Sequence, residues 1–381
     1  MPQTYAFADP LILYGVPHSL YTGVVRCYLR TQGIAYIERP TSHPDFAQRI
    51  MPTIGRSIIP VVMLPDGRII QDSVDIIDHF EQCRVPWPAY PDGPLHRILA
   101  IIVQYYGSQA MLRHAMHYRW SYLGQQEAFL RDAFAAGSGH DMAEKIMTRM
   151  QSYLPQLGIT ETSIPVIEHS FESLLDILEH HFREHPYLFG GRPSVADYGL
   201  IGPMFAHLGR DPVPSDLMKR RAPRVFRWVE RMTAPRLDAP EFTQYGTDYY
   251  ANDSLPETLT PLFAHIAEEI FPELTSKLMF MDDHVNQLKP ADGQPVSDKP
   301  HQRYIGVINT RFRDVPVSAG VQPYLLYMLR RADAVMAGLN ESEHSRVLAG
   351  LQRHGLDQAL PGHRGYSVAR QNHIEVWEIA N

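Results

Sequence analysis

Cysteine is nearly absent from this sequence, with only Cys27 and Cys83 among 381 residues. A disulfide framework needs several paired cysteines, and a structural zinc site needs cysteines or histidines at short, regular spacing. The two cysteines show no such spacing, so the sequence argues against both kinds of fold. We expect both side chains to be small core residues.

Positive charge is not in excess either. The chain has 35 lysines and arginines against 42 aspartates and glutamates, which gives a net charge of −7, and no basic stripe stands out. Proteins that bind nucleic acids or anionic membranes rely on such clusters. The composition therefore argues against either as the main partner.

Long apolar segments are also missing. The longest hydrophobic runs fall far short of the roughly 20 residues that span a bilayer, and residues 1–9 have no basic segment ahead of an apolar one. We therefore expect a cytoplasmic protein without a membrane span. At 381 residues the chain is too long for one hydrophobic core, so two or three packed units are expected.

What the sequence does contain is an ordered set of three short pieces between Leu11 and Glu81. The first reads as a buried strand over 11–14 that breaks at Gly15 into a loop and continues into a helix. A loop of this kind aims backbone N–H groups and a hydroxyl at whatever lies above the helix N-terminus. The helix dipole favours an anion at that point.

The second and third pieces form a hairpin and a helix start. The pattern predicts a strand over 58–63 with Pro60 near its beginning, where proline is tolerated at an edge, at a strand start or in a cis turn. The turn over 65–67 joins this strand to the third piece. There, Asp72 or Ser73 is expected to cap the helix that follows.

In this order, the motifs Ser-x-Tyr-Thr-x-x-Val-Arg, Ile-Pro-Val-Val and Asp-Ser-x-x-Ile-Ile resemble the N-terminal domain of the glutathione transferase family. The resemblance implies a thioredoxin-like fold, a small mixed sheet flanked by helices. It also implies that Pro60 is cis and that the backbone of Ile59 bonds the cysteinyl part of glutathione. Asp72 and Ser73 would hold the γ-glutamyl group, although the family usually has Glu or Gln where Asp72 stands.

Ser19 is the main catalytic candidate. A thiol has a pKa of about 8.5 and reacts as the thiolate, so a donor aimed at the sulfur raises the reactive fraction. The resemblance to serine-type members gives this task to Ser19, and tyrosine-type members make Tyr14 the runner-up. The alternatives are that Ser19 only caps a helix and that Tyr14 is a core tyrosine.

Disulfide exchange is excluded at this loop. Thiol-redox relatives of the fold carry Cys-x-x-Cys where this chain reads Ser19-Leu20-Tyr21-Thr22, and neither end of the motif is a cysteine here. A thiol oxidoreductase is therefore ruled out as a function for this site.

The second unit begins after a proline-rich stretch over 84–94 that cannot form a helix or a regular strand. By resemblance, the helices that follow face the glutathione domain, which makes Tyr118, Arg119 and Trp120 candidates for the pocket of the electrophile. Simple packing between domains is the alternative. Further on, Ser194 and Asp197 form a capping box in a Pro-Ser-x-Ala-Asp stretch that resembles the family's C-terminal domain, where it is structural.

Metal sites are not expected. The segment His181–His185 fits the H-x-x-E-H pattern of some zinc peptidases, but His185 adjoins Pro186 at a helix end and no later glutamate ligand presents itself. His114 and His117 offer no better ligand set.

We therefore expect three parts: a thioredoxin-like glutathione-binding domain over 1–85, an all-helical domain over 95–244, and a mainly helical extension over 245–381 that ends in a short β-hairpin. In the extension, the pattern predicts a helix over 258–271 and a long polar loop over 282–302. Three roles are open for the extension: it covers the mouth of the active site, forms a subunit interface or binds a partner, and the sequence does not choose among them.

The expected function follows from the resemblance. It implies a glutathione transferase that moves alkyl or aryl groups, with glutathione as co-substrate, no metal, an apolar electrophile as second substrate, and a homodimeric assembly. The alternative is a binding or scaffold protein that keeps the fold without efficient catalysis, because the same scaffold also serves non-catalytic tasks.

Overall fold

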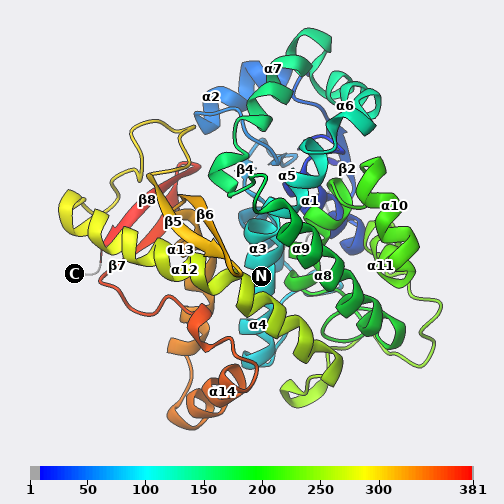
Figure 1. The fold of residues 1–381 in the computed structure, drawn as a ribbon, viewed down its shortest axis with the longest axis vertical. Coiled ribbons are helices and arrows are strands. Elements are labelled where there is room, and N and C mark those ends of the chain that lie inside the picture. The colour runs from blue at the N-terminus through cyan, green and yellow to red at the C-terminus, as the bar shows by residue number, and fades with distance from the viewer. Residues whose placement is uncertain (1–8, 380–381) are drawn as a thin grey trace.

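The computed structural model describes residues 9–379 and is shown as a ribbon in Figure 1. Most of the N-terminal stretch considered above therefore lies outside the described residues, as do residues 380 and 381. The described chain contains a small sheet with flanking helices, a set of longer helices, and an extension that adds helices and two β-hairpins.

The N-terminal part is a mixed sheet of four strands in the order β2-β1-β3-β4. β1 is parallel to β2 and antiparallel to β3, which is antiparallel to β4. The elements are β1 (Leu11–Tyr14), α1 (Leu20–Gln32), β2 (Tyr36–Arg39), η1 (Phe46–Ile50), α2 (Met51–Ile54), β3 (Val61–Met63), β4 (Ile69–Gln71) and α3 (Ser73–Glu81). The expected thioredoxin-like architecture is confirmed.

The alternation of side chains along the strands explains why both faces of this sheet are covered. Leu13 and Val62 point into the main core, together with residues of α1 and α3. Their strand neighbours Tyr14 and Val61 point to the opposite face and pack against Phe46.

In the β3–β4 hairpin, Pro60 and Gly67 determine where the strand begins and how the chain turns. The predicted strand over 58–63 is shorter in the structure, because β3 begins only after Pro60, which has no N–H for the strand ladder. Gly67 has a φ of 89°, and its N–H donates to the Leu64 carbonyl at 2.9 Å. The predicted turn between β3 and β4 is therefore confirmed.

The second part is all-helical, as expected. Its helices are α4 (Pro94–Tyr105), η2 (Tyr106–Ala110), α5 (Leu112–Trp120), α6 (Leu123–Ser138), α7 (His140–Gln151), η3 (Pro155–Leu157), α8 (Ile164–Glu184), α9 (Val195–Ala206), α10 (Pro212–Arg221) and α11 (Pro223–Thr233). The predicted capping box is present at the start of α9: the Ser194 hydroxyl accepts from the Ala196 N–H at 3.2 Å, and the Asp197 carboxylate accepts from the Ser194 N–H at 2.9 Å.

The extension differs from the prediction in two places. Its elements are η4 (Ala251–Asp253), η5 (Glu257–Leu259), α12 (Thr260–Leu288), β5 (Gly306–Phe312), β6 (Val315–Val321), α13 (Tyr324–Ala337), α14 (Glu341–Arg353), η6 (Asp357–Ala359), β7 (Tyr366–Gln371) and β8 (Ile374–Ile379). The terminal hairpin β7–β8 is confirmed, but α12 runs 17 residues beyond the predicted end at Phe271, and the β5–β6 hairpin was not predicted.

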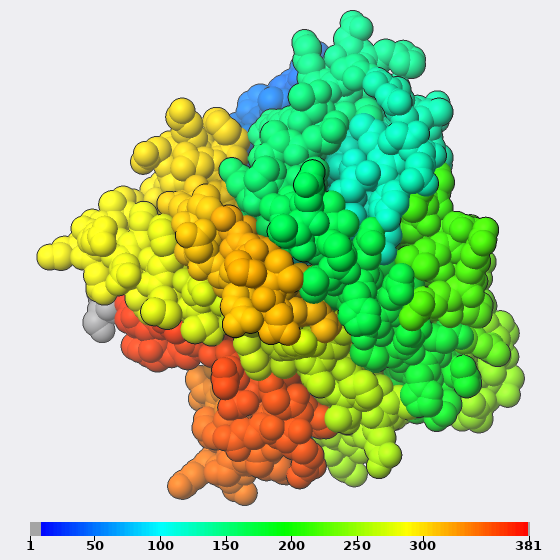
Figure 2. All heavy atoms as spheres, viewed as in Figure 1, coloured from blue at the N-terminus to red at the C-terminus, as the bar shows by residue number. Residues whose placement is uncertain are grey.

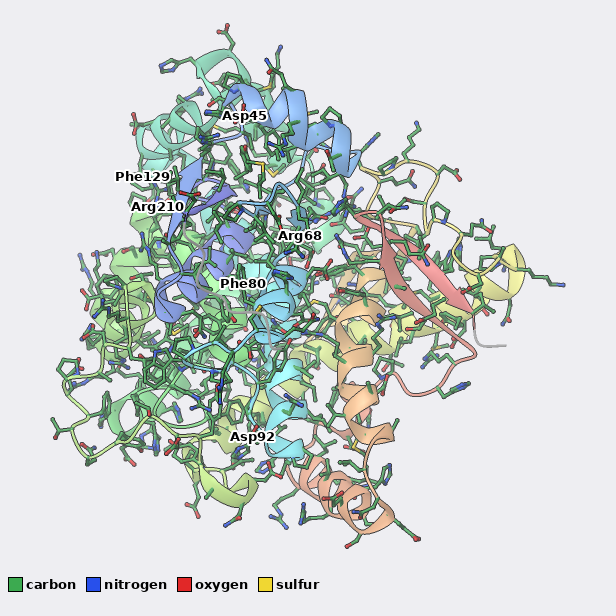
Figure 3. The ribbon with its side chains drawn as sticks, turned by 180° about the vertical axis from the view of Figure 1, so that it is seen from behind. Asp45, Arg68, Phe80, Asp92, Phe129 and Arg210 are labelled. Atoms are coloured by element: carbon green, nitrogen blue, oxygen red, sulfur yellow. The ribbon has the colours of Figure 1, made fainter. Side chains whose placement is uncertain are left out.

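The extension packs against both other parts. Figure 1 shows α12 crossing in front of the central helices, and Figure 2 shows the yellow-to-red surface of the extension meeting the green helical domain along a continuous boundary. Seen from behind, the β7–β8 hairpin lies beside α13 (Figure 3). One hydrophobic core contains Leu13, Ile101 and Leu329, and therefore joins all three parts.

Two smaller expectations concern membranes and cysteines. Among residues 9–379, no helix is long and apolar enough to cross a membrane. Cys27 and Cys83 are both buried and unpaired, as predicted, and burial raises the pKa of the Cys27 thiol to about 12.

Candidate functional site

Ser19 lies at the N-terminus of α1, as the sequence predicted. It is the N-cap residue, with extended backbone angles, and its hydroxyl oxygen accepts a hydrogen bond from the Thr22 N–H at 3.3 Å. The side chain is half-buried. The structure thus gives Ser19 the capping role that the sequence left as the alternative, and Ser19 lines neither of the two cavities described below.

Tyr14, the second catalytic candidate, lies on the far face of the sheet. Its side chain is fully buried and its ring contacts Phe46, with 5.8 Å between the ring centres. Burial raises the pKa of the Tyr14 hydroxyl. This is the environment of the core tyrosine that the sequence left as the alternative.

Four of the five predicted glutathione contacts, all except Ser19, meet at one place between β3 and α3. The Ile59–Pro60 peptide bond is cis, and the Pro60 carbonyl accepts from the Asp72 N–H at 3.4 Å. Asp72 caps α3, because its Oδ1 accepts from the Val74 N–H at 2.8 Å, and Ser73 is the first residue of that helix. Ile59, Pro60, Asp72 and Ser73 line a single cavity, together with Tyr21 of α1.

The opposite wall of this first cavity comes from the rest of the chain. It is formed by Gln109 of the helical domain and by Arg303, Gln322 and Tyr324 of the extension. The Tyr324 hydroxyl donates to Asp72 Oδ1 at 2.7 Å. The cavity is about 20 Å³ in volume, which is room for one water molecule.

A cluster of ion pairs beside the cavity fixes the terminal hairpin to α3. Arg370 of β7 donates through Nε to Asp75 Oδ2 at 2.8 Å and through Nη1 to Glu375 Oε1 at 2.6 Å, and its Nη1 lies 3.8 Å from Asp72 Oδ2. The Tyr327 hydroxyl donates to Asp75. Burial and the neighbouring Asp72 raise the pKa of Asp75 to about 6, against the opposing effect of Arg370.

Arg56 completes the cluster from the thioredoxin-like domain. Its guanidinium donates to Glu375 Oε2 at 3.0 Å, to the His373 carbonyl at 2.7 Å and to Gln71 Oε1 at 3.1 Å. Burial would raise the pKa of Glu375, but the hydrogen bond and charge of Arg56, with the charge of Arg370, outweigh it and lower this pKa. The extension is therefore held by charged groups next to the predicted glutathione contacts.

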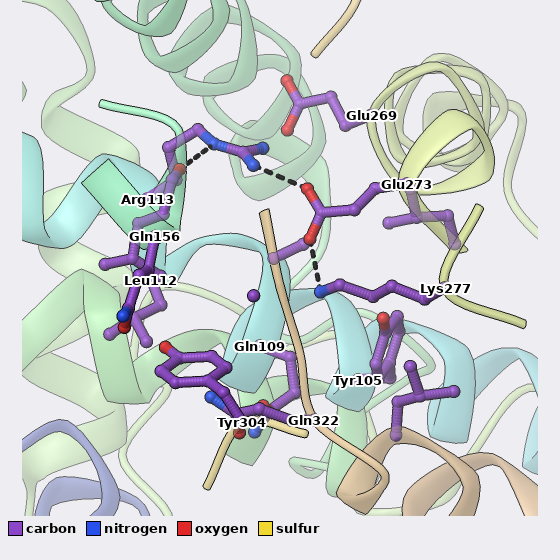
Figure 4. A pocket seen from close by; sticks show the side chains of 15 residues that line it. Tyr105, Gln109, Leu112, Arg113, Gln156, Glu269, Glu273, Lys277, Tyr304 and Gln322 are labelled. Carbon is purple, nitrogen blue, oxygen red and sulfur yellow. Dashed lines mark hydrogen bonds and ion pairs between the residues drawn. The ribbon is translucent and has the colours of Figure 1, made fainter. Parts of the chain in front are cut away.

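A second cavity of about 40 Å³ adjoins the first, and Gln109 and Gln322 line both. Figure 4 shows its charged wall, where Arg113 donates to the Leu157 carbonyl at 2.6 Å and to Glu273 Oε2 at 2.6 Å. Lys277 Nζ lies 2.5 Å from Glu273 Oε1. Although burial opposes it, the charges of Lys277 and Arg113 lower the pKa of Glu273 to about 2.

The sequence did not single out this charged wall. Its signal was present, because Glu269, Glu273 and Lys277 stand at intervals of four and therefore share one face of α12. Because the predicted helix ends at Phe271, Glu273 and Lys277 fall outside it, and the prediction does not place the three residues on one helix face.

The three candidates for the electrophile pocket are buried on α5, and none of them lines either cavity. Tyr118 packs against Phe171, and Trp120 belongs to the smaller core of the helical domain. Arg119 forms a two-point ion pair with Asp211, at 2.7 and 2.9 Å. All three therefore take part in packing, the alternative that the sequence left open.

Arg119 also reaches the loop that carries Ser19. Its Nη1 donates at 3.0 Å to the carbonyl of His18, the residue just before Ser19. Burial, followed by the charges of Arg119, Arg210 and Arg26, lowers the pKa of His18 to about 3, so this imidazole is neutral at pH 7. Arg210 itself lies over the Phe129 ring, 4.7 Å from its centre (Figure 3).

The two histidines of the H-x-x-E-H segment, His181 and His185, form hydrogen bonds with other groups of the protein. His181 bonds the Thr258 hydroxyl at 2.8 Å and the Tyr187 carbonyl at 3.2 Å, while His185 bonds the Tyr245 hydroxyl at 2.5 Å. Within residues 9–379, no group of histidine, cysteine, aspartate and glutamate side chains is arranged to hold a metal ion.

Comparison with known families decides the identity of the fold. Residues 13–86 match the family profile "Glutathione S-transferase, N-terminal domain", and residues 165–231 match "Glutathione S-transferase, C-terminal domain". Both domains of the glutathione transferase family are therefore present in this chain. Neither profile reaches the extension, whose elements are additions to the two glutathione transferase domains of this protein.

Several solved structures are similar to this chain over about three-fifths of its length. Glutathione transferase GSTFuA3 from Phanerochaete chrysosporium is 16% identical, with 61% of this chain and 99% of that chain covered and a TM-score of 0.44. CsGST63524 from Ceriporiopsis subvermispora, solved in complex with glutathione, is 18% identical, with 61% and 100% covered and a TM-score of 0.42. FzlA from C. crescentus is 14% identical, with 64% and 97% covered and a TM-score of 0.39.

At these identities and TM-scores the structural likeness adds nothing to the assignment, which rests on the two domain profiles. No curated protein matches the sequence.

Proposed function

We propose that this protein binds glutathione on its thioredoxin-like domain and uses Ser19 to stabilise the glutathione thiolate for attack on an apolar electrophile. The observation that carries the proposal is the first cavity. It is lined by Ile59, Pro60, Asp72 and Ser73, which are four of the five residues to which the family resemblance gives glutathione contacts; the fifth, Ser19, lies outside it at the N-terminus of α1.

Each of these groups has a physical task in the proposal. The backbone of Ile59 bonds the cysteinyl part, and Asp72 and Ser73 hold the γ-glutamyl ammonium and carboxylate at the N-terminus of α3. Ser19 donates to the sulfur, and the dipole of α1 favours the anion. Lowering a thiol pKa by one unit requires about 1.4 kcal/mol of preference for the thiolate, which one charge-assisted hydrogen bond with a helix dipole supplies.

Titration calorimetry with reduced glutathione tests binding, backed by a thermal shift. Glutathione at about 100 times its dissociation constant should stabilise the native state by roughly 2.7 kcal/mol. Ser73→Ala should weaken binding, whereas Ser152→Ala, which removes an exposed hydroxyl bonded only to the Arg149 carbonyl at 2.7 Å, should not. Conjugation of an aryl halide should then fall in Ser19→Ala, and an unchanged rate would refute the role of Ser19.

The second candidate function is a non-catalytic binding or scaffold protein. It is favoured by the size of the first cavity, about 20 Å³, against the several hundred Å³ of ordinary ligand pockets. Asp72 in place of the usual Glu or Gln points the same way. No heat and no thermal shift at high millimolar glutathione would select this function.

We also propose, from the family resemblance, that the protein is a cytoplasmic homodimer. Light scattering at micromolar concentration tests the assembly: a mass twice the 43.5 kDa of one chain is expected, and the mass of one chain would refute it.

A further inference from the structure

We propose that residues 297–305 form a strap that closes the glutathione site, so that glutathione binds only when the strap swings away. The inference rests on the proposed function, because it concerns the same site. It assigns to the extension a regulatory role that neither family profile describes.

The strap is fixed at both ends and crosses the site between them. At one end the Val296 N–H donates to the Glu375 carbonyl of β8 at 3.1 Å, and at the other the Ile305 N–H donates to the Val321 carbonyl of β6 at 3.0 Å. Between these points, residues 298–303 are exposed. A short exposed segment between two anchored ends can open without unfolding the elements that hold it.

The side chains near the end of the strap reach both cavities. Arg303 lines the first cavity and lies 6.0 Å from the centre of the Tyr21 ring. Tyr304 lines the second cavity and rests against Gly320 of β6, where a Cβ atom would collide with its ring. The strap therefore contributes one side chain to each cavity: the first cavity lies between the thioredoxin-like domain, the helical domain and the extension, and the second lies between the helical domain and the extension.

Few contacts join the strap to the domain that it covers. Arg56 Nη1 donates to the Pro300 carbonyl at 3.2 Å. Beside the strap, the Tyr324 hydroxyl occupies Asp72 Oδ1, the carboxylate proposed for the glutathione ammonium. A ligand that brings its own ammonium to Asp72 competes with this neutral hydroxyl for the carboxylate oxygen.

The volumes show that the closed strap and glutathione exclude each other. The cavities measure about 20 and 40 Å³, whereas sites for small molecules measure about 300–1,000 Å³. The opposite wall of the first cavity is formed by residues 58–60 just before β3, by Gln71 at the end of β4 and by the N-terminus of α3, and β3 and β4 are paired in the sheet. The strap is therefore the wall that moves.

If only the open form binds glutathione, the measured affinity depends on the fraction of molecules in which the strap is open. The apparent dissociation constant equals the intrinsic constant divided by the open fraction. Variants that weaken the closed state should therefore bind glutathione more tightly, although they remove contacts from the protein.

Calorimetry on the full-length chain tests this with reduced glutathione. Tyr304→Ala removes the contact of the strap with Gly320. Tyr324→Phe, on α13 outside the strap, removes only the hydroxyl that competes for Asp72. Each should lower the dissociation constant by about fivefold or more. Tyr327→Phe is the matched control: it also loses a tyrosine–aspartate bond, to Asp75, but does not line the first cavity, and its affinity should stay within about twofold of wild type.

Hydrogen exchange of the peptide over 297–305 gives a second readout. Saturating glutathione should increase its exchange in the wild type, and Tyr304→Ala should increase it without ligand. If Tyr304→Ala does not fold, Arg303→Gln replaces it. Equal affinity in all variants with unchanged exchange would overturn the strap and leave the proposed function standing. No binding in any variant, even where the strap exchanges freely, would overturn both.

Discussion

At the scale of single residues, Arg119 joins parts of the chain that meet at the proposed site. Its guanidinium pairs with Asp211, and it also donates to the carbonyls of Ala206 and His18, at 2.6 and 3.0 Å. Both partners of the ion pair are almost completely buried. Arg119 therefore acts as a positioning residue for the loop that carries Ser19.

Removing the charge of Arg119 leaves Asp211 buried and unpaired. Arg119→Met, which keeps the length of the side chain, should lower the free energy of unfolding by about 3–5 kcal/mol. The matched control is Arg131→Met, because Arg131 is 46% exposed and pairs with the exposed Glu127, at 2.7 Å, and Glu144, and exposed pairs of this kind are worth about 1 kcal/mol or less each. Urea denaturation measures both, and equal losses would contradict the structural role of Arg119.

At the scale of elements, local chemistry predicted some parts and not others. Pro60, the turn at Gly67 and the Ser194–Asp197 capping box act within a few residues, so the sequence shows them directly. Asp72, by contrast, has a φ of 96°, an unfavourable conformation for a non-glycine residue. Its hydrogen-bond partner Tyr324 stands 252 positions later in the sequence. A local sequence pattern cannot predict a contact between residues so far apart.

The wrong end of α12 and the missed β5–β6 hairpin have physical reasons. Pro272 lacks one N–H, but the helix continues because Leu274, Leu278 and Met281 are buried beyond it. The hairpin turns at Arg313, which has a φ of 51° without being glycine or asparagine. Tertiary burial outweighed local propensity in the helix, and the two-residue turn, Arg313-Asp314, lacks the glycine or asparagine of the strongest hairpin signals.

Helix α12 is joined to the helical domain through Glu269, which is 2% exposed. Its carboxylate accepts from the Tyr106 hydroxyl at 3.0 Å, from the Ser170 hydroxyl, and from Arg313 at 3.1 and 3.2 Å. Burial opposes ionisation, but the charges of His114 and His265, with the hydrogen bonds of His265 and Ser170, lower the pKa of Glu269. Glu269 is therefore ionised at neutral pH.

Neutralising this carboxylate should loosen the docking of α12. Glu269→Gln leaves the guanidinium of Arg313 without its buried counter-charge, and the free energy of unfolding should fall by about 3 kcal/mol or more. The adjacent Glu268→Gln is the matched control, because that carboxylate is half-exposed and pairs with the same arginine at 2.6 Å. Its loss should cost about 1 kcal/mol or less in urea denaturation, and similar costs for both variants would refute the role of Glu269.

At the scale of the whole molecule, the shared core predicts that the three parts unfold together. His181 lies at the junction: it belongs to α8 and bonds Thr258 at the start of the extension. The Tyr187 carbonyl can only accept, so His181 Nε2 carries the hydrogen and donates to it. His181 Nδ1 then accepts from the Thr258 hydroxyl, and both hydrogen bonds are satisfied by the neutral imidazole. Burial, followed by the charge of His185, lowers the pKa of His181 to about 3.

Acid should therefore weaken the fold through His181. Its folded pKa lies below the unfolded value of about 6.5, so the unfolded state takes up the proton first and stability falls as the pH drops below 6.5. Between pH 7.5 and 5.5 this residue should remove about 1.4 kcal/mol. Urea denaturation at the two pH values should show a loss smaller by that amount in His181→Gln, whereas His180→Gln, which replaces an exposed neighbour, should keep the wild-type loss. The same pH dependence in His181→Gln and wild type would mean that His181 does not stay neutral in the folded protein.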